Sequence, residues 1–97
     1  MGTFLTRIEL HDTSRSGEEY ELLHEEMRKL GFKRSIPRDD GKRYQLPTAE
    51  YHSIHDDTSD GVMEIAKIAA NKTGLKYSVV VANCFSISFD YLDVVKS

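Results

Sequence analysis

The first strand signal lies at residues 3–12, where apolar and polar positions alternate. Phe4, Ile8 and Leu10 fall on one face, and strict alternation of this kind assigns that face to a core. The opposite face carries a mixed set of side chains, namely Leu5, Arg7, Glu9 and His11. This pattern predicts a sheet with one face covered by helices and a second, partly apolar face left for a partner.

Two helices are predicted from apolar stripes with start and stop signals. A capping-box pattern at residues 16–19 begins the first helix, and Gly31 stands where a left-handed C-terminal residue belongs. His24 lies one position past the apolar stripe of this helix and is interpreted as peripheral. The second helix follows the polar loop at residues 56–60, and Gly74 closes it.

A hairpin is predicted between the two helices. Residues 32–36 form a short strand candidate, Asp39-Asp40-Gly41 is a turn signal, and the return strand runs from about residue 42 to 51. Pro47 lies inside that return strand and has no backbone donor, so we expect a bulge or a break in the hydrogen-bond ladder there.

Two further strand signals follow the second helix with no turn between them. Residues 75–84 contain a β-branched run, and residues 85–90 alternate between apolar and polar. One strand over both pieces would be unusually long. We therefore expect either a bent strand or a second piece that crosses to a neighbouring chain.

The order strand, helix, strand, strand, helix, strand predicts an α+β ferredoxin-like sandwich. The 97 residues suffice for one domain, which we place at 1–97, with a core at about 3–84 and a C-terminal strand or extension at 85–97. A chain of this size buries modest surface by itself, so pairing with a second copy as a homodimer is expected.

Basic side chains gather in one segment of a chain whose net charge is −3. Seven of the 13 basic residues lie in residues 28–43, against only two acidic ones. Such a segment can hold a phosphate backbone, and flanking aromatic rings can stack on bases. The predicted RNA-binding set is Arg28, Lys33, Arg34, Arg38, Lys42, Arg43 and Tyr44. The competing interpretation is a solvated helix end and hairpin.

A possible catalytic group ends the first strand. Asp12 can hold a divalent cation such as Mg²⁺ through its carboxylate, and His11 can act as a base or a ligand. Arg7, on the same strand, would support a phosphate. The competing interpretation is that Asp12 only closes a turn.

Other signals exclude several classes. Cys84 is the only cysteine, so an internal disulfide is impossible. The N-terminus lacks signal-peptide features, and no apolar run approaches the ~20 residues of a membrane span, so a cytoplasmic location is expected. His52, His55 and a following Asp lack zinc spacing and are interpreted as a hydrated loop.

Three segments together carry a family resemblance: Thr6-Arg7-Ile8-Glu9-Leu10-His11-Asp12, the helix with Tyr20, and Leu46-Pro47-Thr48-Ala49-Glu50-Tyr51. Over about residues 3–84 the chain resembles small bacterial proteins grouped with the GhoS type V antitoxin family. The resemblance implies a ferredoxin-like fold similar to the small dimeric subunit of the CRISPR adaptation complex. It also implies a sequence-selective endoribonuclease of a toxin–antitoxin system. The wider fold carries an Asp at the position of Asp12 and pairs a C-terminal extension across a dimer.

Two functions are therefore expected as alternatives. The first is a homodimeric RNA-binding protein with Mg²⁺-dependent endoribonuclease activity at Asp12. The second is a non-enzymatic dimeric interaction module that binds a protein partner or a small ligand through the open sheet face, together with the apolar edge formed by Phe85, Ile87 and Phe89. RNA binding should weaken steeply with salt, whereas an apolar interface should barely respond.

Overall fold

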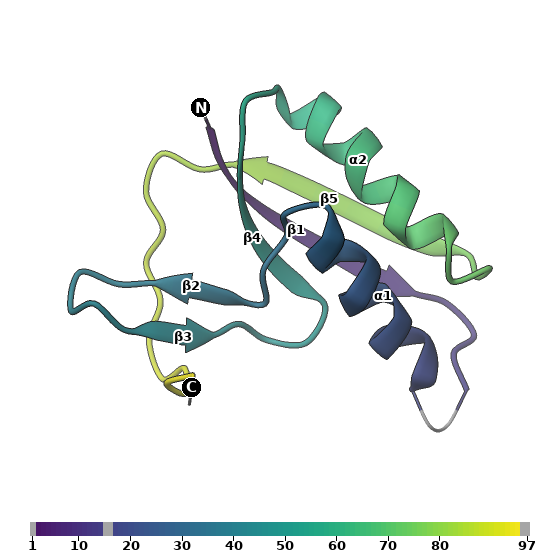
Figure 1. Cartoon of the computed structure of the whole chain (residues 1–97), viewed down its shortest axis with the longest axis horizontal. Helices are drawn as coiled ribbons and strands as arrows, with labels where there is room; N and C mark the ends of the chain where they lie inside the picture. Colours follow the sequence, from purple (N-terminus) through teal and green to yellow (C-terminus); the bar gives the residue numbers. More distant parts are fainter. Residues whose placement is uncertain (1, 15–16, 96–97) are drawn as a thin grey trace.

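The computed structural model describes residues 2–14 and 17–95 (Figure 1). Its elements, in chain order, are β1 (Gly2–Leu10), α1 (Glu18–Lys29), β2 (Ser35–Pro37), β3 (Arg43–Gln45), β4 (Glu50–His55), α2 (Ser59–Asn71) and β5 (Tyr77–Asn83). Within the described chain these five strands and two helices confirm the α+β class. None of its helices is long and apolar enough to cross a membrane.

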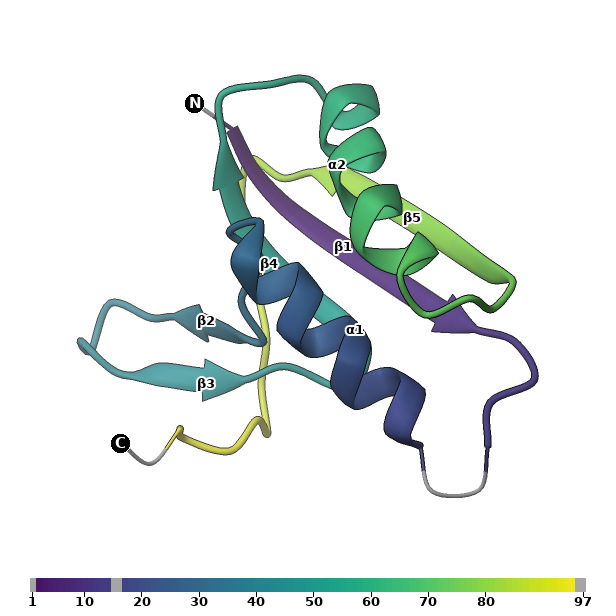
Figure 2. The same ribbon diagram turned by 45° about the vertical axis from the view of Figure 1, so that its right-hand side comes forward.

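The main sheet has three antiparallel strands in the order β4-β1-β5, which makes the N-terminal strand central. Thr6 pairs with Tyr51 of β4 and with Val81 of β5. Both helices lie over the same face of this sheet, and the other face has no helix against it (Figure 2). The prediction of one covered and one open face is therefore confirmed for the described chain.

The core follows the alternation of β1. Phe4 and Ile8 are completely buried between the sheet and the helices, whereas Arg7 and Glu9 of the same strand are exposed. Each fully buried side chain of this size contributes roughly 1.5–3 kcal/mol through the hydrophobic effect. The rest of the core comes from the end of β1, both helices, the segment after α1 and β4, with Leu10, Leu23, Met27, Phe32, Tyr51, Val62, Ala66, Ala69 and Ala70.

Local signals place the helix ends. Gly17 has a left-handed backbone and forms the N-cap of α1 without a side-chain hydrogen bond, while Ser16 of the predicted capping box lies outside the described residues. Gly31 follows α1 with φ 92°, as predicted, because glycine has no Cβ to clash there. Thr58 caps α2 by accepting a hydrogen bond from the Gly61 amide at 3.1 Å.

The predicted return strand is broken at its proline. β2 and β3 form a separate two-stranded sheet in which Ile36 pairs with Tyr44, and β4 begins only at Glu50. Pro47 cannot donate to a ladder, and Ala49 has φ 70°, so the chain turns between the two strands. On the outer edge of β4 the structure has a single bridge, Lys33–His52, instead of a fourth full strand.

The expectation of a strand at residues 85–90, or of one bent strand continuing β5, is wrong for the isolated chain. β5 ends at Asn83, and the last pairing with β1 is the Cys84 amide donating to the Thr3 carbonyl at 2.7 Å. The chain then crosses to the hairpin, where Val94 forms a bridge with Tyr44 (Figure 1). The physical reason is that Cys84 already bonds to Thr3, next to the first described residue of β1, so no strand among the described residues lies beside residues 85–90. Pairing of this segment with a second chain stays a prediction.

Candidate nucleic-acid interface

A cleft of about 500 Å³ separates α1 from the segment that leads into β2. Side chains spaced three, four and seven residues apart put one face of α1 along the cleft, and Phe32, which is 1% exposed, lies against it from the core. The lining residues are Glu21, His24, Glu25, Arg28, Phe32, Lys33, Arg34, Ser35 and Arg43. The cleft therefore collects charged groups from three segments of the chain beside a buried aromatic ring.

The cations of the cleft differ in how they are held. Arg43 donates from Nε to the Ser35 hydroxyl at 2.7 Å and from Nη2 to the Ser35 carbonyl at 2.8 Å. Arg28 pairs with Glu25 at 2.6 Å. Among the described residues, neither Lys33 nor Arg34 has an ion-pair partner. With four cations against two carboxylates, the cleft has the charge and the donor geometry of an anion site.

A hydrogen-bonded histidine stands in the same cleft. The Nδ1 atom of His24 lies 2.6 Å from the hydroxyl of Tyr51, which is fully buried. Burial lowers the pKa of His24, the Arg34 charge lowers it further, and Glu21 acts in the opposite direction. Burial also raises the pKa of the Tyr51 phenol well above its usual value. His24 is therefore a neutral imidazole at pH 7, oriented by a buried hydroxyl.

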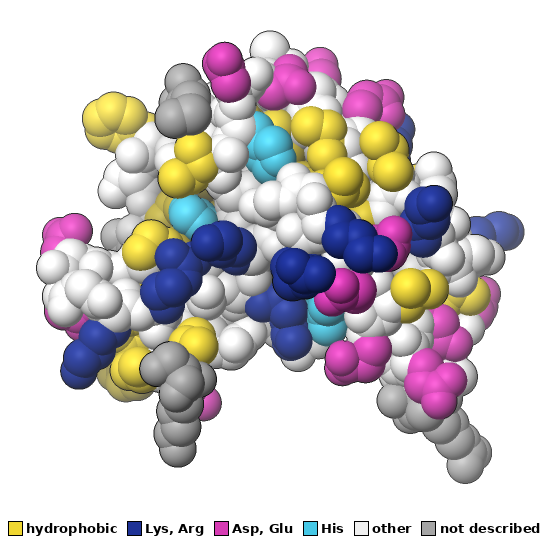
Figure 3. All heavy atoms as spheres, viewed as in Figure 1, with side chains coloured by type: hydrophobic (Ala, Val, Ile, Leu, Met, Phe, Trp, Pro, Cys, Tyr) yellow, Lys and Arg dark blue, Asp and Glu magenta, His cyan; other side chains and the backbone are white. Residues whose placement is uncertain are grey.

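The remaining members of the predicted RNA-binding set lie farther along the hairpin. Arg38 lies over the adjoining rings of Tyr44 and Phe89, with its guanidinium carbon 5.3 Å and 4.7 Å from their centroids. Tyr44 donates its hydroxyl to Asp40 at 2.6 Å, and Lys42 is exposed. Lys and Arg side chains form a band across the face that carries α1 and the hairpin (Figure 3). The structure thus brings Arg28, Lys33, Arg34 and Arg43 together in the cleft and leaves Arg38, Lys42 and Tyr44 outside it.

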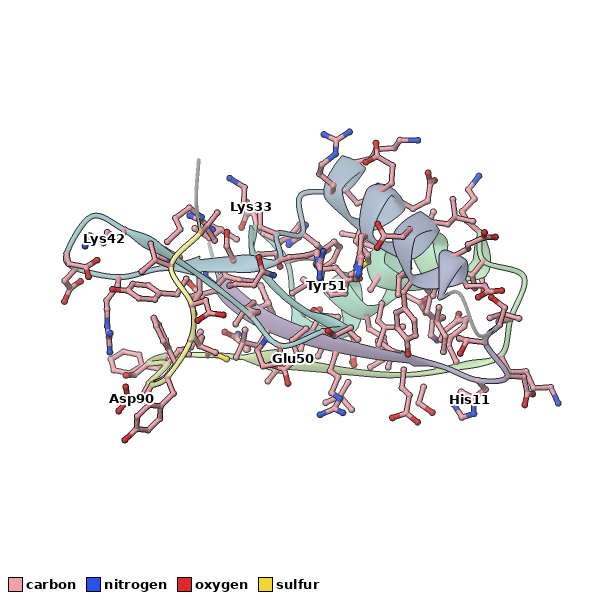
Figure 4. The ribbon with its side chains drawn as sticks, turned by 90° about the horizontal axis from the view of Figure 1, so that it is seen from below. His11, Lys33, Lys42, Glu50, Tyr51 and Asp90 are labelled. Atoms are coloured by element: carbon pink, nitrogen blue, oxygen red, sulfur yellow. The ribbon has the colours of Figure 1, made fainter. Side chains whose placement is uncertain are left out.

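The predicted catalytic set lies elsewhere. Figure 4 shows His11 at one end of the molecule and Lys42 at the other. The Nε2 atom of His11 lies 2.9 Å from the Ser78 hydroxyl, and Arg7 approaches Glu50 at 3.8 Å on the open sheet face. Asp12 follows β1 in an exposed turn with φ 58°.

A magnesium site at Asp12 was also predicted. Within the described ranges no group of three or more His, Cys, Asp or Glu side chains is placed to hold a metal ion. Mg²⁺ demands near-octahedral oxygen coordination, and one exposed carboxylate supplies a small part of it. The side chains of a single chain therefore do not fit Mg²⁺, and we derive no reaction step through a metal.

The open sheet face presents a second, more apolar surface. Val80 is 65% exposed and Ile54 58%, and they stand on the two outer strands of the sheet. A shallow hollow of about 160 Å³ lies on this face, lined by Leu5, Thr6, Arg7, Glu50, Val80 and Ala82. This is the surface on which the interaction-module alternative depends.

Comparison with known proteins assigns no family, because no family model matches the chain and no curated protein matches it. The resemblance to the GhoS family is not tested by these comparisons and stays a prediction.

Proposed function

We propose that this chain is an RNA-binding protein that holds the phosphate backbone of a single strand in the cleft between α1 and β2. One observation carries the proposal: Lys33 and Arg34, without ion-pair partners among the described residues, stand beside Arg28 and Arg43 in one cleft. Cations that no carboxylate neutralises are available to phosphate, and a bound strand releases counterions when they engage it.

The arrangement of the arginines supports phosphate as the ligand. Ser35 fixes the Arg43 guanidinium through two hydrogen bonds, so little side-chain freedom is lost when that planar fork meets phosphate oxygens. Lys33 acts beside it as a flexible point charge. Farther along the hairpin, Tyr44, Phe89 and Arg38 form an aromatic and cationic cluster of the kind on which bases stack.

The finer form of this proposal is an endoribonuclease of a toxin–antitoxin system, built as a ferredoxin-like homodimer. It rests on the sequence resemblance and on the central position of β1, whose end at Leu10 leads into the turn with Asp12. Because Asp12 is one carboxylate far from the cleft, cleavage with Mg²⁺ would require the Asp12 groups of two chains to meet. RNA binding in the cleft does not depend on that assembly.

Fluorescence anisotropy with a labelled single-stranded RNA of about 12 nucleotides tests the binding site. The Lys33→Glu/Arg34→Glu variant should lose at least about 100-fold in affinity, since two phosphate contacts become two repulsions. Its matched control is Lys72→Glu/Lys76→Glu, which changes the net charge equally at exposed positions outside the cleft. The control should stay within about threefold of the wild type at ~150 mM salt.

Two results would contradict the proposal. One is equal weakening by both double variants, which would mean that only net charge matters. The other is wild-type binding that does not change between about 50 and about 300 mM salt, because counterion release makes phosphate binding salt-dependent.

A second candidate function is a non-enzymatic dimeric interaction module. The exposed Ile54 and Val80 on the open sheet face favour it, with Leu5 between them on β1. Val80→Asp should then abolish self-association in sedimentation velocity and leave RNA affinity unchanged. If the wild type sediments as a monomer at high concentration and Val80→Asp does not alter it, the dimeric form of this alternative fails.

A further inference from the structure

A second cavity, of about 260 Å³, adjoins the cleft and shares two of its cations. Lys33 and Arg43 line both spaces, and His52, Ser53 and Ile54 of β4 complete the second one together with Gly31 and Pro37. Lys33 and His52 are bridge partners, with backbone hydrogen bonds of 2.8 Å and 2.7 Å between them. This backbone pairing fixes the position of the histidine relative to Lys33.

His52 differs from the other histidines in its hydrogen bonding. His11, His24 and His55 each have a ring nitrogen within 3.1 Å of an oxygen partner. His52 is only 7% exposed, and its ring nitrogens have no hydrogen-bond partner in the part of the chain that the structure describes. Among the described residues the one buried side-chain polar atom without a partner is Thr6 Oγ1, so the His52 ring nitrogens still reach solvent in the cavity and are open to a ligand there.

The charges around His52 select the kind of ligand. Lys33 faces it from the segment before β2, and Arg43 faces it from β3. Burial lowers the pKa of His52, and these two cations lower it further. The carboxylate nearest in sequence, Glu50 on the same strand, approaches Arg7 at 3.8 Å. The cavity thus presents two cations and a neutral imidazole, a combination that favours an anion able to accept several hydrogen bonds.

We propose that this cavity is a second phosphate subsite, in which Lys33 and Arg43 balance the charge of a phosphate and the His52 imidazole donates a hydrogen bond to it. The inference rests on the proposed RNA binding, because a single strand that engages the shared Lys33 and Arg43 would place neighbouring phosphates in the two spaces. An anion beside the imidazole favours its protonated form, so binding takes up a proton and the affinity rises as the pH falls from about 8 to about 6.

Histidine ring signals in NMR spectra of the full chain test the subsite without any substitution. Inorganic phosphate is added first, followed by a short oligouridine with either a 5′-phosphate or a 5′-hydroxyl. The His52 signals should move and its pKa should rise, whereas the His11 signals, from an exposed ring beside Ser78 and away from the cavity, serve as an internal control. A preference for the 5′-phosphate identifies a terminal phosphate, and equal binding identifies a backbone phosphodiester.

His52→Gln supplies a second readout, since it keeps a donor but cannot become a cation. Its RNA affinity at about pH 6 should fall by about tenfold, because a hydrogen bond from a charged imidazolium is replaced by one from a neutral amide. The difference from the wild type should shrink at about pH 8, where the imidazole is neutral. Because the wild-type titration stands by itself, misfolding of this variant would not remove the test.

The outcomes separate this inference from the proposed function. If phosphate moves the His52 signals but RNA does not bind, the subsite stands and the RNA proposal fails. If RNA binds with the expected salt dependence while phosphate and RNA leave the His52 signals unmoved, the subsite is overturned and RNA binding stands. If neither ligand binds, both are overturned.

Discussion

The cleft beside α1 and the end of β1 both carry residues that the sequence predicted to be functional. The second region, which holds Arg7, His11 and Asp12, is called the rim, and its side chains are held differently from those of the cleft. In the cleft, Arg43 is fixed by two hydrogen bonds to Ser35, and His24 is oriented by the buried hydroxyl of Tyr51. At the rim, Asp12 is exposed in a turn, and the His11 contact to Ser78 lies in solvent. Fixed donors beside a buried ring form a binding site at lower entropic cost than exposed side chains do.

The difference comes from where each set of residues sits in the fold. The cleft joins three segments, α1, the chain around Lys33 and β3, so its groups converge on one space. The rim draws on a single strand, and alternation sends Arg7, Glu9 and His11 to one face while the chain turns at Asp12. Arg7, His11 and Asp12 are therefore close in the sequence, but their functional atoms do not converge on one site.

The largest expected difference between the two regions is in stability. Phe32→Ala removes a ring that is 1% exposed and should lower the free energy of unfolding by about 3–5 kcal/mol. Asp12→Asn should change it by less than about 0.5 kcal/mol, because asparagine also tolerates a left-handed backbone. Urea unfolding followed by circular dichroism measures both values. An Asp12→Asn loss above about 2 kcal/mol would show that the rim is held as firmly as the cleft.

The next difference is in RNA binding. Lys33→Gln should lower the slope of log affinity against log salt by about 0.7, the value expected when one single-strand phosphate contact is lost. Asp12→Asn should leave that slope unchanged and the affinity within about twofold. The same two proteins, incubated with RNA and Mg²⁺, examine the nuclease prediction. Cleavage by the wild type that disappears in Asp12→Asn would give the rim the function and reduce the cleft to a docking surface.

Stability should also depend on pH through the half-buried His24 and the buried His52. The pKa values of His24 and His52 in the folded protein lie below the unfolded value near 6.5, so the unfolded chain binds more protons in that window. The free energy of unfolding should therefore have its highest value above about pH 7 and decrease as the pH falls below 6.5. The carboxyl groups with a lowered pKa are Glu19, Glu25 and Asp40, and they act separately below 4.5.

Urea unfolding at several pH values between about 5 and about 8 measures this dependence. His24→Gln and His52→Gln should each flatten the curve, because each removes one group that gains a proton on unfolding. If the wild-type curve is flat across that range, the two histidines are not shielded as the structure indicates.

Local signals predicted the scaffold well. Alternation placed Phe4 and Ile8 in the core, and Pro47 marked the break between β3 and β4, since both depend on neighbours in the chain. The sequence of residues 85–90 could not show whether they form a strand, because a strand needs a partner strand. Gly2 is the first residue of β1, so β1 does not extend far enough to pair with them. Only the three-dimensional pairing shows this.

The sequence predicted the cations of the cleft but missed His24 in the cleft and His52 in the adjoining cavity. His24 was interpreted as peripheral and His52 as part of a hydrated loop, yet His52 is 7% exposed and both line cavities. One usable signal was present for His24: it shares the helix face of Glu21 and Arg28, at spacings of three and four residues. No comparable signal existed for His52, whose cationic neighbours lie 19 and nine positions away in the chain.

The smallest expected effect isolates the hydrogen bond that orients His24. Tyr51→Phe keeps the buried ring and removes only the hydroxyl 2.6 Å from Nδ1, so it should cost about 1 kcal/mol of unfolding free energy. Tyr77→Phe is its matched control, because its hydroxyl donates to Asn71 at an exposed site, where water replaces the lost partner. The control should cost less than about 0.5 kcal/mol. If both variants cost the same, the His24–Tyr51 bond gains nothing from burial, and the cleft is no better ordered than the rim.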